Sequence, residues 1–477
     1  MWVIIYYIFC YLIFGYTMLL MASYMYLVIM SHKAQARLGI NIPDDETIKY
    51  FLQGSPLTPA VSIIAPAFNE EVTILDNVYS LMQIDYPDYE IIIVNDASTD
   101  RTMELLINEF KLVEVPYDIA MRVQSKPIKR VLKSTEEKYS KLVVVDKEHG
   151  GKKADGSNAG INVCSNKYFV CTDVDCIIEP MALYRMMWLV VNSHRPMIGV
   201  SATMLMSNGC IVEDGRVVEA AVPDTLIPMF QQMEYLRSFL ISKLGWSSIN
   251  ALPNISGGFG LFDTDVAVKS GGYDPTSMAE DVDMLLRMVT YMKNKGQEFR
   301  LAQVPKICCW TEGPGSVKSI YRQRVRWARG LFEIISNHRK LFFNPHYGPI
   351  GAFTLPYIFI FEFIAPILEM TGFFFMVWLI LIGGVNWDTA IILFGMIYVF
   401  SVFMAFFVLY FDYSAKAVNW HNTRVSYLKL LMVTLLEPFL YHPIITYCSI
   451  VGYWRFISNQ TAVWKPIQRQ GVKKKKS

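Results

Sequence analysis

Residues 61–96, VSIIAPAFNEEVTILDNVYSLMQIDYPDYEIIIVND, contain two β-branched apolar runs separated by a stretch with helical spacing. The same alternation continues further along the chain. The apolar runs are 61–66 (VSIIAP), 90–95 (EIIIVN), 142–145 (LVVV) and 168–171 (YFVC), and the helical stretches are 71–82 and 100–110. Strands that alternate with helices predict an α/β domain with a mostly parallel sheet flanked by helices.

Carboxylates follow two of these runs. Asp96 comes directly after 90–95, and Asp173 and Asp175 come just after 168–171. Taken singly, each acidic group is also explained as a turn residue. However, ligands bind at the carboxyl ends of strands in such sheets, and two carboxylates flanking one residue of an extended segment point to the same side. The pattern is that of a half-shell for a hard divalent cation with open positions for phosphate oxygens.

Three later motifs each have a plain structural reading beside a functional one. Gly257–Gly260 (GGFG) is either a tight turn or a place where a ligand approaches the backbone. Glu280 and Asp281 head an apolar helical pattern, where acidic groups complement the helix dipole. The segment 323–327 (QRVRW) fits an interfacial amphipathic helix with a Trp anchor. No GxxxxGK[ST] loop and no GxGxxG after a strand occur, which excludes the P-loop and Rossmann classes.

The composition indicates a membrane protein. Of 477 residues, 53% are hydrophobic and only 18% charged, against about 25% charged in soluble proteins. The first apolar run, 2–30, is long enough to cross a bilayer. A signal peptide is the alternative, but no basic region precedes this run and its apolar part is too long. Because Lys33 and Arg37 follow it, we expect residue 1 outside and the next segment in the cytoplasm.

Further apolar segments lie at 350–384, 389–412 and 427–452. The first is too long for a simple span, so its prolines mark either a hairpin or an interfacial helix leading into one crossing. Glu437, Pro438 and Pro443 predict a broken last segment. We expect three to five crossings, with the basic tail Lys473–Lys476 inside. Glu362, Glu369 and Tyr410 fit either a channel wall or inter-helix pairing.

Charge and cysteine content exclude other classes. The net charge of +2 gives no support to nucleic-acid binding, and the locally basic stretch 122–153 lacks the interleaved aromatic residues of single-strand binders. The eight cysteines are scattered without zinc or redox spacing, so we interpret them as reduced thiols.

The order of the motifs resembles the processive family 2 glycosyltransferases, which include cellulose, hyaluronan, chitin and poly-N-acetylglucosamine synthases. The motifs are Asp96, Asp173-x-Asp175, Glu280-Asp281 and Gln323-x-x-Arg326-Trp327, and further similar blocks are 66–70 (PAFNE), 150–158 (GGKKADGSN), 256–262 (SGGFGLF), 271–274 (GGYD) and 309–312 (CWTE). The resemblance is close over 60–345 and loose beyond. It departs at Ala279, where many relatives carry Thr.

The resemblance implies a GT-A glycosyltransferase domain inserted between N- and C-terminal transmembrane helices. The expected parts are a transmembrane helix (1–32), a cytosolic GT-A domain with interfacial helices (33–345), a transmembrane or channel region (346–455) and a cytosolic gating-like segment with a basic tail (456–477). Within the last part, WKPIQR (464–469) resembles the family's gating region. The implied location is a bacterial inner membrane, with several spans and a cytoplasmic catalytic domain.

The resemblance also implies site roles. Glu70 and Asp96 would hold the uracil and ribose, and Lys153 (or Lys152) would contact the diphosphate. Asp173 and Asp175 would hold Mg²⁺ or Mn²⁺, and Asp281 would be the general base. Gln323, Arg326 and Trp327 would bind the diphosphate and the acceptor sugar, and Asp173 and Glu280 would also bind substrate. Inverting transfer needs a base on the acceptor side and neutralisation of the departing diphosphate, which these residue types supply.

The implied function is an inverting hexosyltransferase that uses UDP-glucose or UDP-N-acetylglucosamine to polymerise and secrete a β-linked polysaccharide. The implied partners are the nucleotide-sugar donor, the growing glycan, membrane lipid and export or accessory subunits, without nucleic acid. One alternative is a lipid glycosyltransferase that adds one or a few sugars to a membrane lipid. A transporter or scaffold with an inactive transferase domain is disfavoured, because all four motifs keep their key residues.

Overall fold

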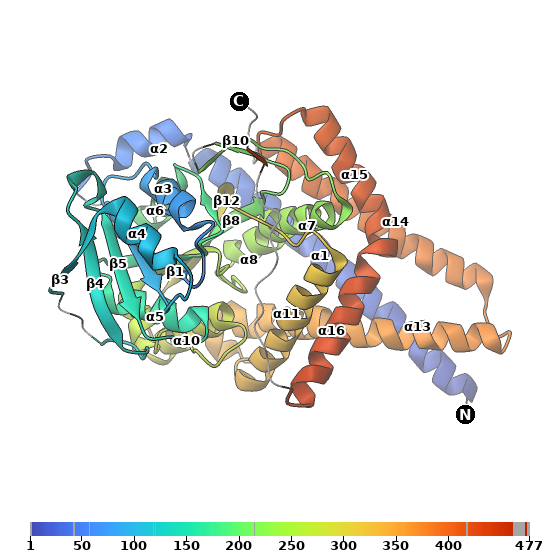
Figure 1. Cartoon of the computed structure of the whole chain (residues 1–477). Coiled ribbons are helices and arrows are strands. Elements are labelled where there is room, and N and C mark those ends of the chain that lie inside the picture. The colour runs from blue at the N-terminus through green and yellow to red at the C-terminus, as the bar shows by residue number, and fades with distance from the viewer. Residues whose placement is uncertain are drawn as a thin grey trace.

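The computed structural model places an α/β part at one end of the molecule and long apolar helices at the other (Figure 1). It describes residues 2–41, 43–56, 58–117, 119, 121–213, 215–415, 418–460 and 473–474. The gating-like segment 464–469 and the lysines at 475–476 lie outside the described residues.

A ten-stranded sheet with the order β3-β4-β5-β2-β1-β6-β11-β8-β12-β7 forms the centre of the α/β part. Its strands are β1 (Val61–Ala67), β2 (Tyr89–Asn95), β3 (Leu112–Val115), β4 (Ile128–Ser134), β5 (Leu142–Lys147), β6 (Tyr168–Thr172), β7 (Ile177–Ile178), β8 (Met197–Met206), β11 (Phe259–Asp263) and β12 (Arg300–Thr311). The four apolar runs quoted from the sequence are therefore strands, as predicted.

The sheet is mixed, which corrects the prediction of a mostly parallel one. The central strands β5, β2, β1 and β6 are parallel. The edge strands β3 and β4 are antiparallel, because no crossover helix joins β3, β4 and β5. Strand β11 lies antiparallel between β6 and β8. Its insertion brings the glycine-rich turn before β11 to the end of β6.

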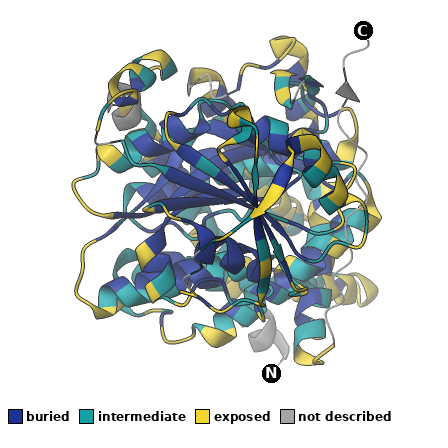
Figure 2. Ribbon diagram, turned by 60° about the vertical axis from the view of Figure 1, so that its left-hand side comes forward, coloured by how far each residue is buried: buried dark blue, intermediate teal, exposed yellow. Residues whose placement is uncertain are grey.

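Helices cover both faces of the sheet, so the strands are buried on both sides (Figure 2). One core contains Ile64, Ile92 and helices α5, α9 and α10, and the other contains Ile63, Ile91 and helices α2, α3, α4 and α6. These helices are α2 (Asp45–Leu52), α3 (Ile74–Met82), α4 (Thr102–Phe110), α5 (Lys153–Val163), α6 (Ala182–Val191), α9 (Thr264–Lys269) and α10 (Glu280–Asn294). A Cβ at Gly160 would lie 2.3 Å from Ile64 Cγ2, so α5 packs directly on β1.

A second group of elements joins the sheet to the apolar helices. They are α7 (Leu226–Arg237), a π-helical segment (Ser238–Lys243), α8 (Leu244–Ser248) and α11 (Val317–Asn337), with a small sheet of β9 (Ile211–Glu213), β10 (Arg216–Glu219) and β13 (Lys473–Lys474) and a short 3-10 turn at Pro345–Tyr347. Another 3-10 turn, Glu137–Tyr139, joins β4 to β5. Helix α11 carries the QRVRW motif. It lies beside α16, so this motif sits where the α/β part meets the apolar helices.

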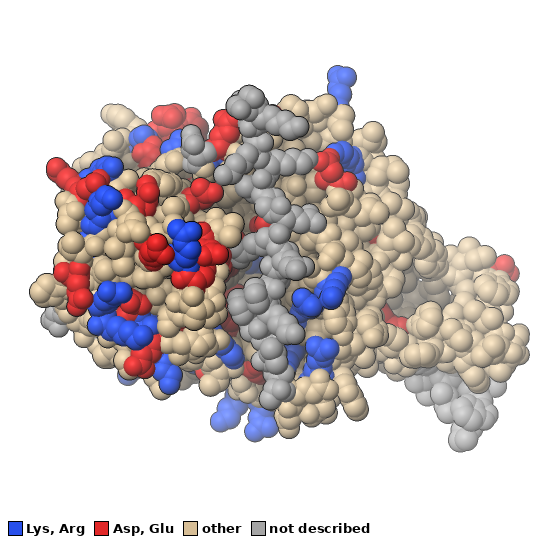
Figure 3. All heavy atoms as spheres, viewed as in Figure 1, with Lys and Arg blue, Asp and Glu red and all other residues tan. Residues whose placement is uncertain are grey.

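Three helices of the described chain are long and apolar enough to cross a membrane: Cys10–Ala36, Ile350–Leu381 and Trp387–Ser414. The first belongs to α1 (Trp2–Asn41) and the third to α14 (Trp387–Ala415). The second consists of a π-helical segment (Ile350–Thr354), α12 (Leu355–Ile358), a second π-helical segment (Phe359–Phe363) and α13 (Ala365–Leu381). The second is one helical run without a hairpin. Charged side chains crowd the α/β part, and the end formed by α13 and α14 is nearly free of them (Figure 3). The chain is therefore membrane-associated.

The last apolar segment is broken, as its prolines predict. Helices α15 (Thr423–Leu440) and α16 (His442–Ile457) meet at Tyr441 with a bend of 48°, and the pair passes as a fourth span if counted as one. Pro438 lies inside α15, where it removes a backbone donor, and Pro443 lies in the first turn of α16.

Candidate active site

Four separate segments converge at the carboxyl end of β6. The Lys153 ammonium nitrogen, at the start of α5, lies 2.5 Å from Asp173 Oδ1 and donates to the Gly257 carbonyl at 2.6 Å. The Gly257 amide donates to Asp281 Oδ2 at 3.1 Å. The metal motif, the lysine, the glycine turn and the predicted base are thus linked by direct contacts, although up to 128 positions separate them in the sequence.

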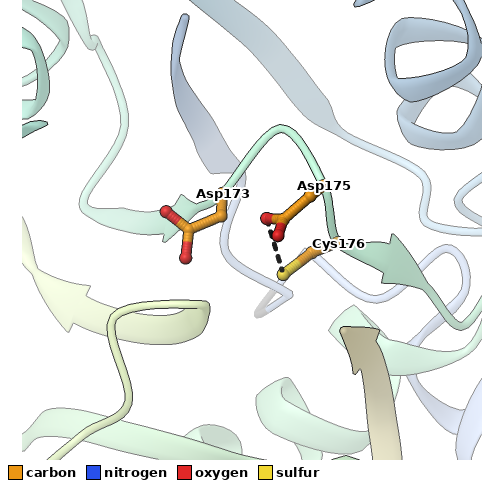
Figure 4. A group of neighbouring side chains, drawn as sticks. All are labelled: Asp173, Asp175 and Cys176. Carbon is orange, nitrogen blue, oxygen red and sulfur yellow. Dashed lines mark hydrogen bonds between the residues drawn. The ribbon is translucent and has the colours of Figure 1, made fainter. Parts of the chain in front are cut away.

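Asp173 and Asp175 lie on one tight turn after β6. The turn closes with the Cys176 amide donating to the Asp173 carbonyl at 3.1 Å, and the Cys176 thiol lies 4.0 Å from Asp175 Oδ1. One ligand atom from each of the three residues lies within 4.8 Å of the others. Figure 4 shows the two carboxylates on opposite arms of the turn, with that of Asp175 beside the thiol. Two half-exposed carboxylates are hard oxygen ligands suited to Mg²⁺ or Mn²⁺.

The two adjacent lysines, which the sequence leaves as alternatives, have different partners. Lys153 joins Asp173 and Gly257, whereas the Lys152 amine donates to the carbonyls of Thr276 at 2.7 Å and Ser277 at 3.3 Å. Burial disfavours the charged amine of Lys153, but the Asp173 carboxylate outweighs it and raises the pKa of Lys153 above its ordinary value. Lys153 is therefore the fully charged lysine at the metal motif.

Asp96 is buried at the end of β2, and its carboxylate is held from several sides. Oδ1 accepts from the Lys147 amine at 2.5 Å and the Gly150 amide at 2.8 Å, and Oδ2 lies 3.0 Å from His149 Nδ1. The Lys147 amine also lies 2.5 Å from Asp155 Oδ2. The sequence analysis missed Lys147 and Asp155, although Asp155 lies inside the quoted block 150–158.

Glu70 lies in the loop that follows β1. Its amide donates to the Thr102 hydroxyl at 2.9 Å, and its carboxylate accepts from the Thr73 hydroxyl at 2.8 Å. The preceding Asn69 has a φ of 58°, a left-handed conformation that its side chain supports by accepting from the Thr99 amide at 2.8 Å. The loops that follow β1 and β2 are thus tied together beside Asp96.

Glu280 and Asp281 open α10 and face the lysine. Burial, followed by the neighbouring Asp281 carboxylate, raises the pKa of Glu280 to about 6, while Lys153 and Arg326 act in the opposite direction. Asp281 Oδ1 accepts from the amide of Val282 at 2.9 Å. The two acidic side chains are therefore near both Lys153 and the QRVRW helix.

Helix α11 positions Gln323, Arg326 and Trp327 against the start of α10. A Cβ at Gly330 would lie 3.0 Å from Ala279 Cβ, so the small residue at 279 permits this close approach. Within the described chain, Arg326 makes no hydrogen bond or ion pair, and the buried Gln323 Oε1 accepts no hydrogen bond. Trp327 is 39% exposed. Arg326 and the Gln323 carbonyl oxygen therefore keep unused binding capacity, and Arg326 is close enough to Glu280 to lower its pKa.

Comparisons with known proteins bear on the family of the chain. Residues 62–118 match the family described as glycosyl transferase family 2, and residues 216–411 match the glycosyl transferase family group 2. The poly-beta-1,6-N-acetyl-D-glucosamine synthase of Staphylococcus epidermidis is 26% identical over 275 residues, which are 58% of this chain and 55% of that protein. A probable glycosyltransferase of Bacillus subtilis is 28% identical over 60% of this chain and 58% of its own length.

The matched region spans just over half of each of these curated relatives. Among solved structures, a mannosyltransferase from Pyrobaculum calidifontis in complex with GDP-mannose and Mn²⁺ is 15% identical, with a TM-score of 0.48, over 91% of this chain and 100% of that one. The two family matches cover the loops after β1 and β2 as well as the glycine turn, Glu280-Asp281 and QRVRW segments. The chain belongs to the family 2 glycosyltransferases.

Proposed function

We propose that the chain transfers a hexose from UDP-glucose or UDP-N-acetylglucosamine to a growing β-linked glycan, with inversion at the anomeric carbon. The observation that carries this proposal is the continuous set of contacts from Asp173 through Lys153 and Gly257 to Asp281. These contacts bring together, in one site, the Lys153 ammonium group, which can bind a diphosphate, and the Asp281 carboxylate, which can accept a proton.

Asp281 acts as the general base on the acceptor. Its carboxylate takes the proton of the acceptor hydroxyl, the acceptor oxygen forms a bond to the anomeric carbon, and the bond from that carbon to the diphosphate oxygen breaks. The electron pair of the broken bond leaves with UDP. The Gly257 amide holds Asp281 Oδ2 at 3.1 Å, so the carboxylate is oriented before the acceptor arrives.

Lys153 and Arg326 bind the departing diphosphate. Arg326 has no ion pair among the described residues, so its guanidinium is available to phosphate oxygens. The charged Lys153 amine donates to Asp173 and to the Gly257 carbonyl, which leaves one of its three N–H groups for a phosphate oxygen. Glu70 and Asp96, at the adjacent strand ends, contact the nucleoside.

Asp173 and Asp175 fit a divalent metal. They supply two carboxylates from one turn, with ligand atoms within 4.8 Å, and Mg²⁺ or Mn²⁺ prefers oxygen ligands of this kind. When bound, the ion neutralises charge on the diphosphate leaving group.

The proposed site of transfer is a bacterial inner membrane, with the α/β part in the cytoplasm. The helices that are long and apolar enough to cross a membrane support a membrane location. Trp327 and the rest of α11 lie against α16, so a growing glycan would leave the site next to the membrane helices. Of the candidate channel residues, Glu369 pairs instead with α16: its Oε2 accepts from the Thr446 hydroxyl at 2.6 Å and lies 3.1 Å from His442 Nε2. Within this proposal, secretion of the polymer is supported by the position of α11 beside α16 and not by Glu369.

The test is incorporation of radiolabelled UDP-glucose and UDP-N-acetylglucosamine by membrane preparations with Mg²⁺ or Mn²⁺. D281N is compared with D265N, which alters an exposed carboxylate paired only with Lys269. Label in alkali-retained polymer that is lost in D281N and kept in D265N supports the proposal. Label only in chloroform-extractable lipid would indicate the lipid transferase, and equal activity of D281N would refute the role of Asp281.

A further inference from the structure

Arg324, the one arginine of the QRVRW segment not assigned to substrate above, is buried where three segments meet. Its side chain is 7% exposed, and it donates from Nη1 and Nη2 to the two carboxylate oxygens of Glu234 on α7, at 2.6 and 2.8 Å. Nη2 also donates to the Tyr441 hydroxyl at 3.1 Å, and that hydroxyl donates to Glu234 Oε2 at 2.8 Å. The three side chains form a closed set of hydrogen bonds.

The same guanidinium lies over the ring of Trp327. The distance from Arg324 Cζ to the indole centroid is 4.3 Å. A planar guanidinium stacks favourably on an aromatic face, and the contact is stronger when the cation is buried. The indole is nevertheless 39% exposed, so the cation supports the ring without covering it.

The orientation of this cation is determined by both carboxylate oxygens of Glu234 and by Tyr441 together. Arg324 differs here from Arg326, which has no ion pair among the described residues. Tyr441 is itself fixed, because its ring stacks on Phe230 of α7 with centroids 5.1 Å apart. Tyr441 is also the residue at which α15 and α16 meet with a 48° bend. The break between the two apolar helices is thus connected to Trp327 through Arg324, by one hydrogen bond to Tyr441 and one stacking contact with the indole.

We propose that Arg324, held by Glu234 and Tyr441, is a positioning residue that fixes the Trp327 ring as a stacking surface for the acceptor sugar, and so couples that surface to the α15–α16 break. This inference rests on the proposed function, in which Trp327 meets the acceptor. The ligand class is a sugar ring that presents an apolar C–H face to the indole.

A second ion pair between the same parts of the molecule serves as the control. Arg237, at the end of α7, donates to both oxygens of Glu437 on α15, at 3.1 and 2.6 Å. It resembles the Arg324–Glu234 pair in chemistry and also ties α7 to another helix, α15 in place of α11, but no described contact links it to Trp327. Loss of general helix packing should affect variants of both pairs, whereas loss of Trp327 positioning should affect only one.

The kinetic experiment varies acceptor oligosaccharide and UDP-sugar separately for R324K, E234Q and Y441F, with R237K and E437Q as controls. We expect R324K to raise the acceptor KM about tenfold, because a lysine cannot make the bidentate and stacked contacts. Y441F keeps its ring stacking and should give a smaller rise. The donor KM should stay unchanged in all five variants. Equal rises in acceptor KM for R324K and R237K would overturn the inference.

A spectroscopic readout separates this inference from the proposed function. The contribution of Trp327 to near-ultraviolet circular dichroism is obtained as the difference between the unaltered chain and W327F. We expect R324K to lose this difference signal and R237K to keep it. If R324K does not fold, Y441F carries the same test. No nucleotide release by the unaltered chain would refute the proposed function alone, and an unchanged difference signal in both R324K and Y441F would refute the positioning role.

Discussion

Gly452 of α16 lies against Ala328 of α11, directly beside Trp327 in the sequence. A Cβ built at Gly452 would lie 2.6 Å from Ala328 Cβ and 2.8 Å from the Val325 carbonyl oxygen. Only a residue without a side chain permits the two helices to approach this closely. The contact fixes the distance between the QRVRW helix and the last apolar helix.

We therefore expect G452A to destabilise the protein by about 1–3 kcal/mol, the range for overpacking a tight contact. Thermal unfolding of the detergent-solubilised chain, followed by size-exclusion chromatography, measures this loss. G395A is the matched control, because no atom lies within 4 Å of a Cβ at Gly395 in α14. Equal stability of the two variants would mean that α11 and α16 do not pack as described.

K153M and K152M should have different effects on donor binding. Lys153 reaches Asp173, whereas Lys152 reaches the carbonyls of Thr276 and Ser277. Loss of a charge-assisted contact to the diphosphate should raise the donor KM at least about tenfold in K153M. K152M should change it much less. Initial rates at varied UDP-sugar concentration test this, and the reverse order would assign the diphosphate to Lys152.

K147M should destabilise the fold strongly. The Lys147 side chain is fully buried between the carboxylates of Asp96 and Asp155, so its removal leaves two buried carboxylates without a cation. Breaking a buried ion pair from one side costs about 3–5 kcal/mol. Denaturant unfolding measures the loss. K269M, which removes an exposed cation, is the control and should leave the unfolding midpoint in place.

Glu280 should make stability depend on pH. Its pKa is raised from 4.5 to about 6 in the folded chain, so between these values the folded state binds more protons than the unfolded state. The free energy of unfolding therefore falls as pH rises from about 4.5 to 6, and stays lower above that range. E280Q should remove this part of the pH dependence. Melting temperatures of both chains from pH 4.5 to 7.5 provide the measurement. Parallel curves would show that Glu280 is not desolvated.

The central strands and the kinds of residue that make up the site could be predicted from the amino-acid sequence alone. The β-branched runs at 61–66, 90–95, 142–145 and 168–171 are long enough and apolar enough that only buried strands accommodate them, and all four are strands. Because ligands bind at the carboxyl ends of strands in such a sheet, the carboxylates after two of these runs indicate the edge at which the site lies. The break between α15 and α16 was also predictable, since proline cannot donate within a helix.

The contacts between residues far apart in the chain could not be predicted from the sequence and become visible in the folded chain. Antiparallel insertion of β11 is a matter of sheet order, which local propensity does not encode, and it brings Gly257 to Asp173. Likewise, Lys152 and Lys153 are chemically identical in the sequence, and only the direction in which each leaves the start of α5 separates their partners. Arg324 and Arg326 differ in the same way, because helical spacing gives neighbouring arginines different surroundings. The inward face of α11 buries Arg324 beside Glu234, whereas Arg326 lies on another face and is left for a ligand.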